Sequence, residues 1–75
     1  MQTIEVMATW DSEVCVWTAT SEDMTGLALE AATLDALAER LRTVIPELLE
    51  LNGQSGGYPV PFRLHGERLE MTRAA

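Results

Sequence analysis

Apolar and polar residues alternate along the start of the chain with the period of a β-strand. Between residues 3 and 10, apolar side chains occupy every second position, at Ile4, Val6, Ala8 and Trp10. This period, with β-branched residues present, is typical of a strand that buries one face. A second run, residues 14–20, is rich in valine, threonine and tryptophan, which favour strands. Because only the polar link Asp11–Glu13 separates the two runs, the sequence predicts an antiparallel hairpin with a loop of about three residues.

The spacing of apolar residues changes to that of a helix after residue 33. They recur at three- and four-residue steps, at Leu34, Leu37, Ala38, Leu41, Ile45 and Leu48. Thr33 is a suitable N-cap, and Asn52-Gly53 is a typical signal for a helix end. Pro46 removes one main-chain donor and crowds the carbonyl four residues earlier, so we expect a kink or a restart near Arg42.

Other segments flank this helix. Gly26 closes an acidic loop, where a glycine permits a main-chain conformation with positive φ. Residues 27–31 then have room for a short third strand. After the helix we expect a flexible loop over residues 53–57, an extended segment over residues 58–71 and a frayed tail over residues 72–75.

The C-terminal extended segment is predicted to lie at a sheet edge. Val60, Phe62 and Leu64 alternate with other residues, and the prolines at positions 59 and 61 cannot donate to a neighbouring strand. The sequence is compatible with two conformations of this segment. We favour one strand with a bulge at His65–Glu67 over a hairpin that turns back at those residues.

Together these elements predict a single α+β domain over residues 1–75. Its fold class is a three-stranded antiparallel meander, one kinked amphipathic helix packed across it and a C-terminal edge strand. The predicted core consists of Ile4, Val6, Trp17, Leu34, Leu37, Leu41, Ile45, Leu48 and Phe62. One core of this size rarely supplies more than about 3–5 kcal/mol. Since Cys15 is the only cysteine and His65 the only histidine, no disulfide or Cys/His metal site can add to it, and we expect a homodimer or higher homo-oligomer.

The charge of the chain is acidic and uneven. Residues 1–52 carry ten carboxylates against two arginines, residues 53–75 carry two against three, and lysine is absent. A surface that follows phosphates needs clustered cations, so we expect no direct binding of nucleic acid. The acidic body is suited to a basic protein partner, although net negative charge also simply keeps a small protein in solution.

The N-terminal segment has no features of a signal peptide, because acidic residues interrupt its apolar positions. No apolar run approaches the roughly 18 residues that a membrane span needs. We therefore expect a cytoplasmic protein that does not associate with a membrane.

The inventory of reactive side chains argues against most classes of enzyme. The chain has no lysine for a Schiff base or P-loop, no phosphate-binding glycine motif and no nucleophilic serine motif. We expect Cys15, inside the second strand, to be a small buried hydrophobe and His65 to be a surface residue of the edge strand. Trp10 and Trp17 are expected to pack in the core, since no cation lies near them in the sequence to assist stacking on a nucleic acid. We predict no enzyme activity and no catalytic, cofactor-binding or metal-binding residue.

The carboxylates leave one metal-dependent alternative open. An RNase H-type nuclease needs three or four acidic groups around two metal ions about 4 Å apart. Asp11 and Asp23, with either Glu39 or Glu47, could be proposed for such a centre. We do not favour it, because a charged helix face is usually only solvated.

Several short motifs, in their order and spacing, resemble the HicB-like antitoxin superfamily. They are Trp10-Asp11, Val14-Cys15-Val16-Trp17, Ala19-Thr20-Ser21-Glu22-Asp23, Gly26-Leu27, Glu30-Ala31 and Pro46-Glu47-Leu48-Leu49-Glu50-Leu51-Asn52. The resemblance covers nearly all of residues 3–71 and is strongest to a short, stand-alone bacterial branch of uncharacterised function. It implies a truncated RNase H-like fold that works by binding and generally lacks the nuclease carboxylates.

The better-known members of that superfamily are antitoxins, so the resemblance also implies a partner. They hold a small basic RNA-cleaving toxin of double-stranded-RNA-binding fold and often dimerise or tetramerise. On this basis we expect a non-enzymatic antitoxin-like domain whose acidic surface covers the RNA-binding face of a toxin. The candidate contact residues are Glu22, Asp23, Asp35, Glu39, Glu47 and Glu50.

Two further expectations follow from the comparison with that superfamily. Full antitoxins usually append a DNA-binding segment after the last strand, and none follows the last predicted strand here, so we expect no operator binding. The alternative function is a homo-oligomeric structural or small-ligand-binding domain, which fold likeness alone does not distinguish from an antitoxin.

Overall fold

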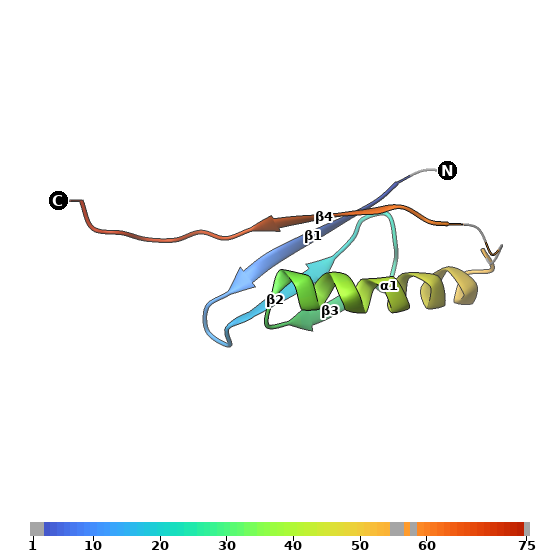
Figure 1. Ribbon diagram of the computed structural model, residues 1–75, viewed down its shortest axis with the longest axis horizontal. Helices are drawn as coiled ribbons and strands as arrows, with labels where there is room; N and C mark the ends of the chain where they lie inside the picture. The colour runs from blue at the N-terminus through green and yellow to red at the C-terminus, as the bar shows by residue number, and fades with distance from the viewer. Residues whose placement is uncertain (1–2, 55–56, 58, 75) are drawn as a thin grey trace.

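A computed structural model of the chain contains one mixed four-stranded sheet with one helix packed on it (Figure 1). The structure describes residues 3–54, 57 and 59–74. Its elements are β1 (Ile4–Asp11), β2 (Val16–Thr20), β3 (Ala28–Ala31), α1 (Leu34–Leu51) and β4 (Phe62–Glu67). The sheet order is β3-β2-β1-β4, which confirms the predicted α+β class with a three-stranded meander and a C-terminal edge strand.

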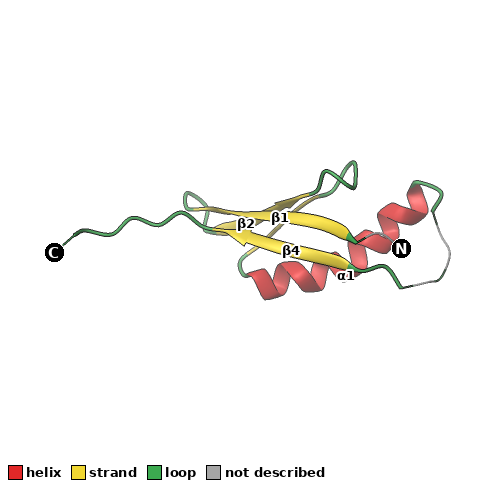
Figure 2. Ribbon diagram, turned by 90° about the horizontal axis from the view of Figure 1, so that it is seen from above, coloured by secondary structure: helices red, strands yellow, loops and turns green. Residues whose placement is uncertain are grey.

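The meander and the edge strand pair in different directions. β1 is antiparallel to β2, and β2 is antiparallel to β3, whereas β4 is parallel to β1. Parallel pairing needs a crossover connection, and α1 supplies it by carrying the chain from β3 at one edge to β4 at the other. Figure 2 shows α1 on one side of the sheet, with the other side of the sheet uncovered. We call this uncovered side the open face.

The core lies between α1 and the covered face of the sheet. Six of the nine predicted core residues are buried: Ile4, Val6, Trp17, Leu37, Leu41 and Ile45. The other three, Leu34, Leu48 and Phe62, are half-buried at its border. The prediction missed four buried residues: Ala8, Ala19, Met24 and Leu27. Met24 and Leu27 belong to the loop after β2, so the acidic loop contributes apolar side chains to the core.

The turn that joins β1 to β2 is longer than predicted. Residues 12–15 form the turn, and β2 begins only at Val16. Cys15 is exposed and has a φ of +56°, and Val14 is 60% exposed. The prediction that Cys15 is a buried strand residue is therefore wrong. The turn needs one residue in the left-handed conformation, and Cys15 takes that position although glycine or asparagine would adopt it at lower cost.

Both ends of α1 agree with the prediction. The side chain of Thr33 accepts a hydrogen bond from the main-chain N–H of Ala36 (3.0 Å), as an N-cap does. At the other end, the N–H of Asn52 donates to the carbonyl of Leu48 (3.0 Å), and Gly53 follows with a φ of +76°.

Pro46 does not divide the helix. α1 runs unbroken from Leu34 to Leu51, so the predicted restart near Arg42 is wrong. The axis of α1 turns in its second half in Figure 2, in keeping with the predicted kink. Leu41 and Ile45 are both buried before the proline, and their packing offsets the one lost hydrogen bond.

The last strand has no bulge. Its register with β1 is continuous from the pair Ile4 and Phe62 to the pair Thr9 and Glu67, so both predicted forms of this segment, a bulge and a hairpin, are wrong. Instead the chain leaves the sheet after Glu67 and runs away from the body of the molecule (Figure 1). We call residues 68–74 the C-terminal arm. Residues 55, 56 and 75, part of the loop and the tail that we predicted to be flexible, lie outside the described residues.

Candidate partner-binding surface

Four of the six predicted contact residues share the outer face of α1. Asp35, Glu39, Glu47 and Glu50 are all exposed. Their spacing of four, eight and three residues places them on one side of the helix. Because Leu37, Leu41 and Ile45 bury the opposite side, these carboxylates point away from the sheet. We call these four residues the acidic face of α1.

No ion pair within the described part of the chain involves a residue of this face. Among the described residues the ion pairs join Glu5 to Arg63, Glu5 to His65, and Arg68 to Glu70, and none includes a residue of α1. Arg40 donates a hydrogen bond to the main-chain carbonyl of Glu30 (2.5 Å), so its cation points toward β3. The four carboxylates of the acidic face are therefore exposed to solvent without an ion-pair partner among the described residues, and Arg42 is the other cation of the helix.

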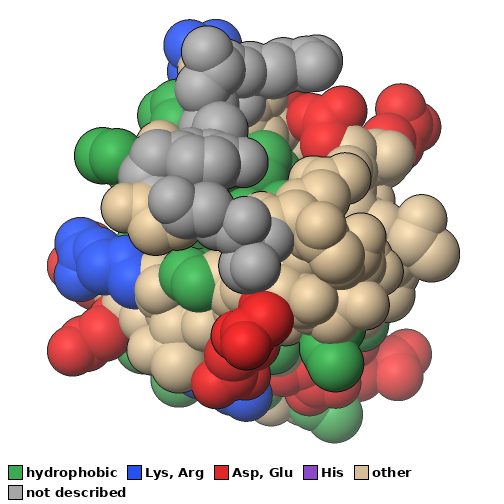
Figure 3. Space-filling model, turned by 90° about the vertical axis from the view of Figure 1, so that its right-hand side faces the viewer, with side chains coloured by type: hydrophobic (Ala, Val, Ile, Leu, Met, Phe, Trp, Pro, Cys, Tyr) green, Lys and Arg blue, Asp and Glu red, His purple; other side chains and the backbone are tan. Residues whose placement is uncertain are grey.

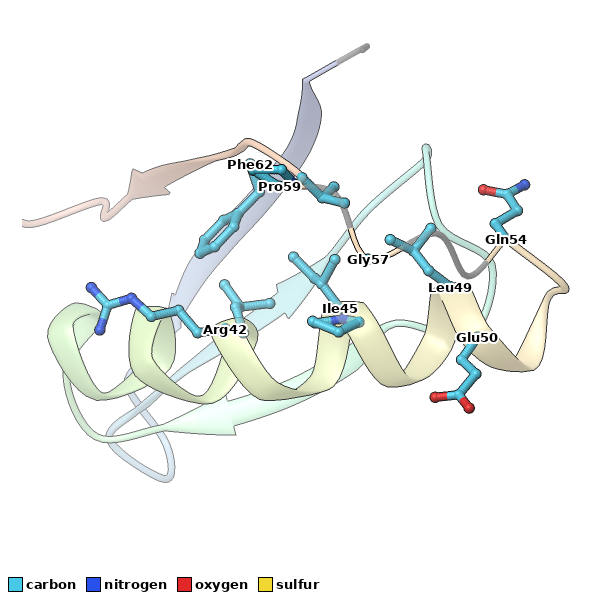
Figure 4. A pocket seen from close by; sticks show the side chains of 11 residues that line it. Arg42, Ile45, Leu49, Glu50, Gln54, Gly57, Pro59 and Phe62 are labelled. Atoms are coloured by element: carbon cyan, nitrogen blue, oxygen red, sulfur yellow. The ribbon is translucent and has the colours of Figure 1, made fainter.

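An apolar groove of about 430 Å³ runs beside the acidic face. The groove is lined by Leu41, Arg42, Ile45, Pro46, Leu49, Glu50, Gln54, Gly57, Pro59, Val60 and Phe62. Figure 4 shows Phe62 directed toward α1, and Ile45 and Leu49 directed toward the segment that precedes β4. The second half of α1 thus forms one wall of the groove, and residues 59–62 form the other.

Glu50 joins the groove to the acidic face. It belongs to the lining of the groove, yet its carboxylate points away from the cavity in Figure 4. Arg42 is the one cation among the lining residues. Acidic side chains lie on several sides of this end of the molecule (Figure 3). An apolar hollow beside an acidic helix face suits a partner segment that has an apolar side chain next to basic ones.

The other two predicted contact residues, Glu22 and Asp23, do not belong to this surface. They border a second hollow with Glu5, Met7 and Thr20. These strand residues lie on the open face, since the alternate residues of β1 and β2 are buried against α1. The structure therefore separates the six predicted residues into two groups on opposite sides of the sheet.

Asp23 also forms hydrogen bonds to other residues of the chain. Its Oδ2 accepts a hydrogen bond from the main-chain N–H of Glu5 (2.8 Å). Its own N–H donates to the hydroxyl of Ser21 (3.1 Å), which in turn donates to the carbonyl of Glu5 (2.6 Å). This network fixes the acidic loop to the start of β1. Glu22 is exposed beside it and is absent from these hydrogen bonds.

The single histidine is placed as predicted, on the edge strand. Its Nε2 lies 2.5 Å from Oε1 of Glu5, whose other oxygen lies 3.7 Å from Nη1 of Arg63. The register pairs Glu5 with Arg63 and Met7 with His65, so the three polar groups share the open face. All are partly exposed, and their arrangement is that of a cross-strand charge cluster.

The two tryptophans pack against each other, as expected. Trp17 is buried, Trp10 packs at the border of the core, and their rings meet edge to face with centroids 5.5 Å apart. No cation lies near them in the sequence, but the fold brings one to Trp10. The guanidinium of Arg68, distant in the sequence, lies 4.1 Å from the centroid of the Trp10 ring.

The carboxylates considered for a nuclease centre lie apart. Asp11 ends β1, whereas Asp23 is bound to the main chain near the start of that strand. Glu39 and Glu47 point outward from α1. Over residues 3–54, 57 and 59–74, no three His, Cys, Asp or Glu residues are placed to hold a metal ion together. In the same residues, α1 is too polar to cross a membrane.

The groove was not predicted from the sequence. Its walls come from α1 and from residues 59–62, which are separated along the chain by the loop after Asn52. Only the apolar character of Leu49, Val60 and Phe62 could have indicated that these segments meet.

The sequence matches a known family, and the fold matches a solved structure. Residues 3–74 match the family described as Domain of unknown function (DUF1902), and the chain belongs to that family. No curated protein matches it. The chain is also similar to a hypothetical protein, TTHA1013, from the extremely thermophilic bacterium Thermus thermophilus. The two are 46% identical, with a TM-score of 0.80 over 95% of this chain and 100% of that one.

Proposed function

We propose that this chain is a non-enzymatic protein-binding domain that holds a small basic partner on α1. The observation that carries the proposal is the position of the apolar groove directly beside the acidic face of α1. An acidic surface attracts a basic partner and orients it, and a neighbouring apolar hollow gives that partner a place to bury a side chain. Neither feature alone distinguishes a binding site from an ordinary surface.

The chemistry of the groove defines the partner more closely. The walls offer the aliphatic and aromatic side chains of Leu49, Ile45 and Phe62. A partner would place a Leu, Met or aromatic residue between them and direct flanking Lys or Arg residues at Glu50 and Glu47. Since these carboxylates form no ion pair among the described residues, such pairs would form without breaking an existing one.

The resemblance to HicB-like antitoxins supports a particular partner class. In that superfamily the bound protein is a small basic RNA-cleaving toxin, and its RNA-binding face has the positive charge that the acidic face of α1 would meet. We propose that this chain is antitoxin-like in this sense, or an orphan relative, and that it acts in the cytoplasm. Of the predicted contact residues, Asp35, Glu39, Glu47 and Glu50 belong to this proposal, whereas Glu22 and Asp23 face the other side of the sheet.

The test is identification of the partner followed by an activity assay. The tagged chain is used to capture proteins from lysate of its own cells, and each captured protein is produced separately. The proposal expects a small basic protein that cleaves RNA when alone and loses that activity when the chain is added. A captured protein whose RNA cleavage is unaffected by a stoichiometric amount of the chain would contradict the antitoxin role.

A second candidate function is the binding of a small apolar ligand in the groove. Its volume of about 430 Å³ is within the range of roughly 300–1,000 Å³ that is usual for ligand pockets. The two functions differ in their dependence on charge. A small apolar ligand would bind equally well after charge reversal of the outward-pointing Glu47, whereas a basic protein would not.

A further inference from the structure

The C-terminal arm carries the most exposed large hydrophobic side chains of the described residues. Leu69 is 86% exposed and Met71 is 90% exposed. They are separated by one residue, as the apolar positions of a strand are, and the arm continues the direction of β4 beyond the sheet (Figures 1 and 2). The arm contributes to the length of the molecule, which measures 55 × 22 × 19 Å.

The base of the arm is held in place, and the rest is not. Arg68 lies over Trp10 and pairs with Glu70 at 3.0 Å. Among the described residues, the hydrogen bonds and ion pairs of the arm involve only these two of its members. The body of the chain therefore fixes the direction of the arm but leaves Leu69 and Met71 uncovered.

The strand that leads into the arm also has an open edge. β4 is the last strand of the sheet and pairs with β1 on one side only. The main-chain donors and acceptors on its other side are available to another strand. An extended arm and an open edge on the same chain can complete each other in two copies of the protein.

We propose that the C-terminal arm is a dimerisation element that pairs antiparallel with the arm and the β4 edge of a second copy. The pairing is centred on Leu69, which faces Leu69 of the second copy across a two-fold axis. Met71 then lies opposite Glu67, the last residue of β4 in the second copy. The arm residues that follow Met71 pair with the open edge of that β4 strand. Because the relation is two-fold, each copy covers the edge of the other and the assembly closes as a dimer.

The charge pattern of the arm favours this register. Arg68 and Glu70 lie on either side of Leu69, so the segment is complementary to itself when read antiparallel. Arg68 of each copy directly faces Glu70 of the other, giving two pairs of opposite charge. A register centred on Glu70 would place two carboxylates opposite each other, and one centred on Arg68 would oppose two guanidinium groups.

This dimer is independent of the proposed partner surface. The acidic face points away from the sheet, and the groove lies beside the segment that enters β4, whereas the arm leaves from the other end of that strand (Figure 1). A dimer of this form would keep both acidic faces accessible. Failure of one proposal therefore does not affect the other.

The first experiment compares the mass of the protein in solution with that of matched variants. We expect sedimentation equilibrium at micromolar concentration to give twice the chain mass of 8.3 kDa for the wild type. The double variant Leu69→Asp, Met71→Asp should be a monomer with an unchanged circular dichroism spectrum, because neither side chain packs on the body. The variant Leu51→Asp removes another exposed apolar side chain, 81% exposed at the end of α1, and should stay dimeric. A monomeric wild type, or a double variant that remains dimeric, would overturn the proposal.

A mixing experiment tests the register. Arg68→Glu and Glu70→Arg each place like charges opposite each other in a homodimer, so each variant alone should dissociate at concentrations where the wild type is dimeric. Mixed together, the two variants should form a heterodimer, because both cross-chain pairs then have opposite charge. Two variants that stay monomeric when mixed would contradict the register.

Cross-linking gives an independent readout. In a Cys15→Ser background, the variant Leu69→Cys should form an intermolecular disulfide with its counterpart on oxidation. The variant Met71→Cys should not, because its counterpart is four positions away along the strand. Efficient cross-linking of the second variant but not the first would overturn the pairing.

Discussion

The guanidinium of Arg68 lies 4.1 Å from the centroid of the Trp10 ring, at the point where the chain leaves the sheet. The parallel register brings these residues together, since the pair Thr9 and Glu67 immediately precedes them. A cation over an indole ring is attracted by the negative face of the π-system. This contact sets the direction of the C-terminal arm and closes one end of the core.

Arg68→Gln should therefore lower the free energy of unfolding by about 0.5–1 kcal/mol, the usual strength of an exposed cation–π pair, because the exposed ion pair with Glu70 that it also removes contributes little. The measurement is urea unfolding in the Leu69→Asp, Met71→Asp background, so that self-association does not contribute. Arg73→Gln in the same background is the control. Among the described residues the cation that lies over an aromatic ring is Arg68, so the substitution of Arg73 should leave the unfolding midpoint unchanged. Equal effects of the two substitutions would show that the contact with Trp10 adds nothing.

Leu41 should not tolerate a charged side chain. It is fully buried between α1 and the sheet, and Leu41→Asp would bury a carboxylate without a partner. We expect this variant to be unfolded by circular dichroism at room temperature. Leu51→Asp, which makes the same chemical change on the exposed part of α1, should melt close to the wild type. If the Leu41 variant melted within a few degrees of the wild type, the helix face that we assign to the core would be wrong.

Gly66 allows the close approach of α1 to the edge strand. A Cβ atom at this position would lie 2.9 Å from Cδ1 of Leu34 and 3.5 Å from the ring of Trp17. Because the clashing atoms are the end of the flexible, half-buried Leu34 side chain, Gly66→Val should cost about 0.5–1.5 kcal/mol, the usual cost of a side chain forced away from its preferred rotamer. Combination with Leu34→Ala should recover part of this loss, because it removes the atom that clashes. Thermal unfolding of the two single variants and the double variant measures the coupling, and strictly additive losses would argue against the clash.

Asp23 and Glu22 should differ in their effect on stability although they are adjacent and both acidic. Asp23→Ala removes the acceptor for the N–H of Glu5 and should cost about 0.5–1.5 kcal/mol, the net range for a hydrogen bond, because this one is exposed to solvent. Glu22→Ala should change the unfolding midpoint little, since that side chain is exposed. Chemical unfolding of both variants is the check, and a Glu22 effect as large as that of Asp23 would show that net charge, and not the hydrogen bond, is responsible.

The features that were predicted best from the sequence are those that depend on residues close together along the chain. The helix from Thr33 to Asn52 follows from its apolar period, its N-cap and its C-terminal glycine, all of which act within a few residues. The hairpin turn was predicted less well. Its left-handed residue is Cys15, and cysteine gives no local signal for that conformation.

The candidate site depends on the topology and was only partly predictable. The acidic face of α1 follows from the helical period, which puts Glu39 and Glu50 on one side of the helix. Glu22 and Asp23 were grouped with them by charge alone, whereas in the structure they line a hollow on the open face of the sheet. The contact of Phe62 with the groove arises from the crossover that makes β4 parallel to β1, and no local pattern distinguishes parallel from antiparallel pairing.

The central claim, that α1 binds a basic protein, can be tested by comparing capture from cell lysate by three forms of the chain. The first is the wild type, and the second carries Glu39→Lys, Glu47→Lys and Glu50→Lys on the acidic face. The third carries Glu13→Lys, Glu22→Lys and Glu30→Lys, which change the net charge equally but lie away from that face. We expect the wild type and the third form to retain the same small basic protein, and the second form to lose it. Equal loss by both variants would show that only net charge matters, and recovery of no protein other than the chain itself would contradict the account.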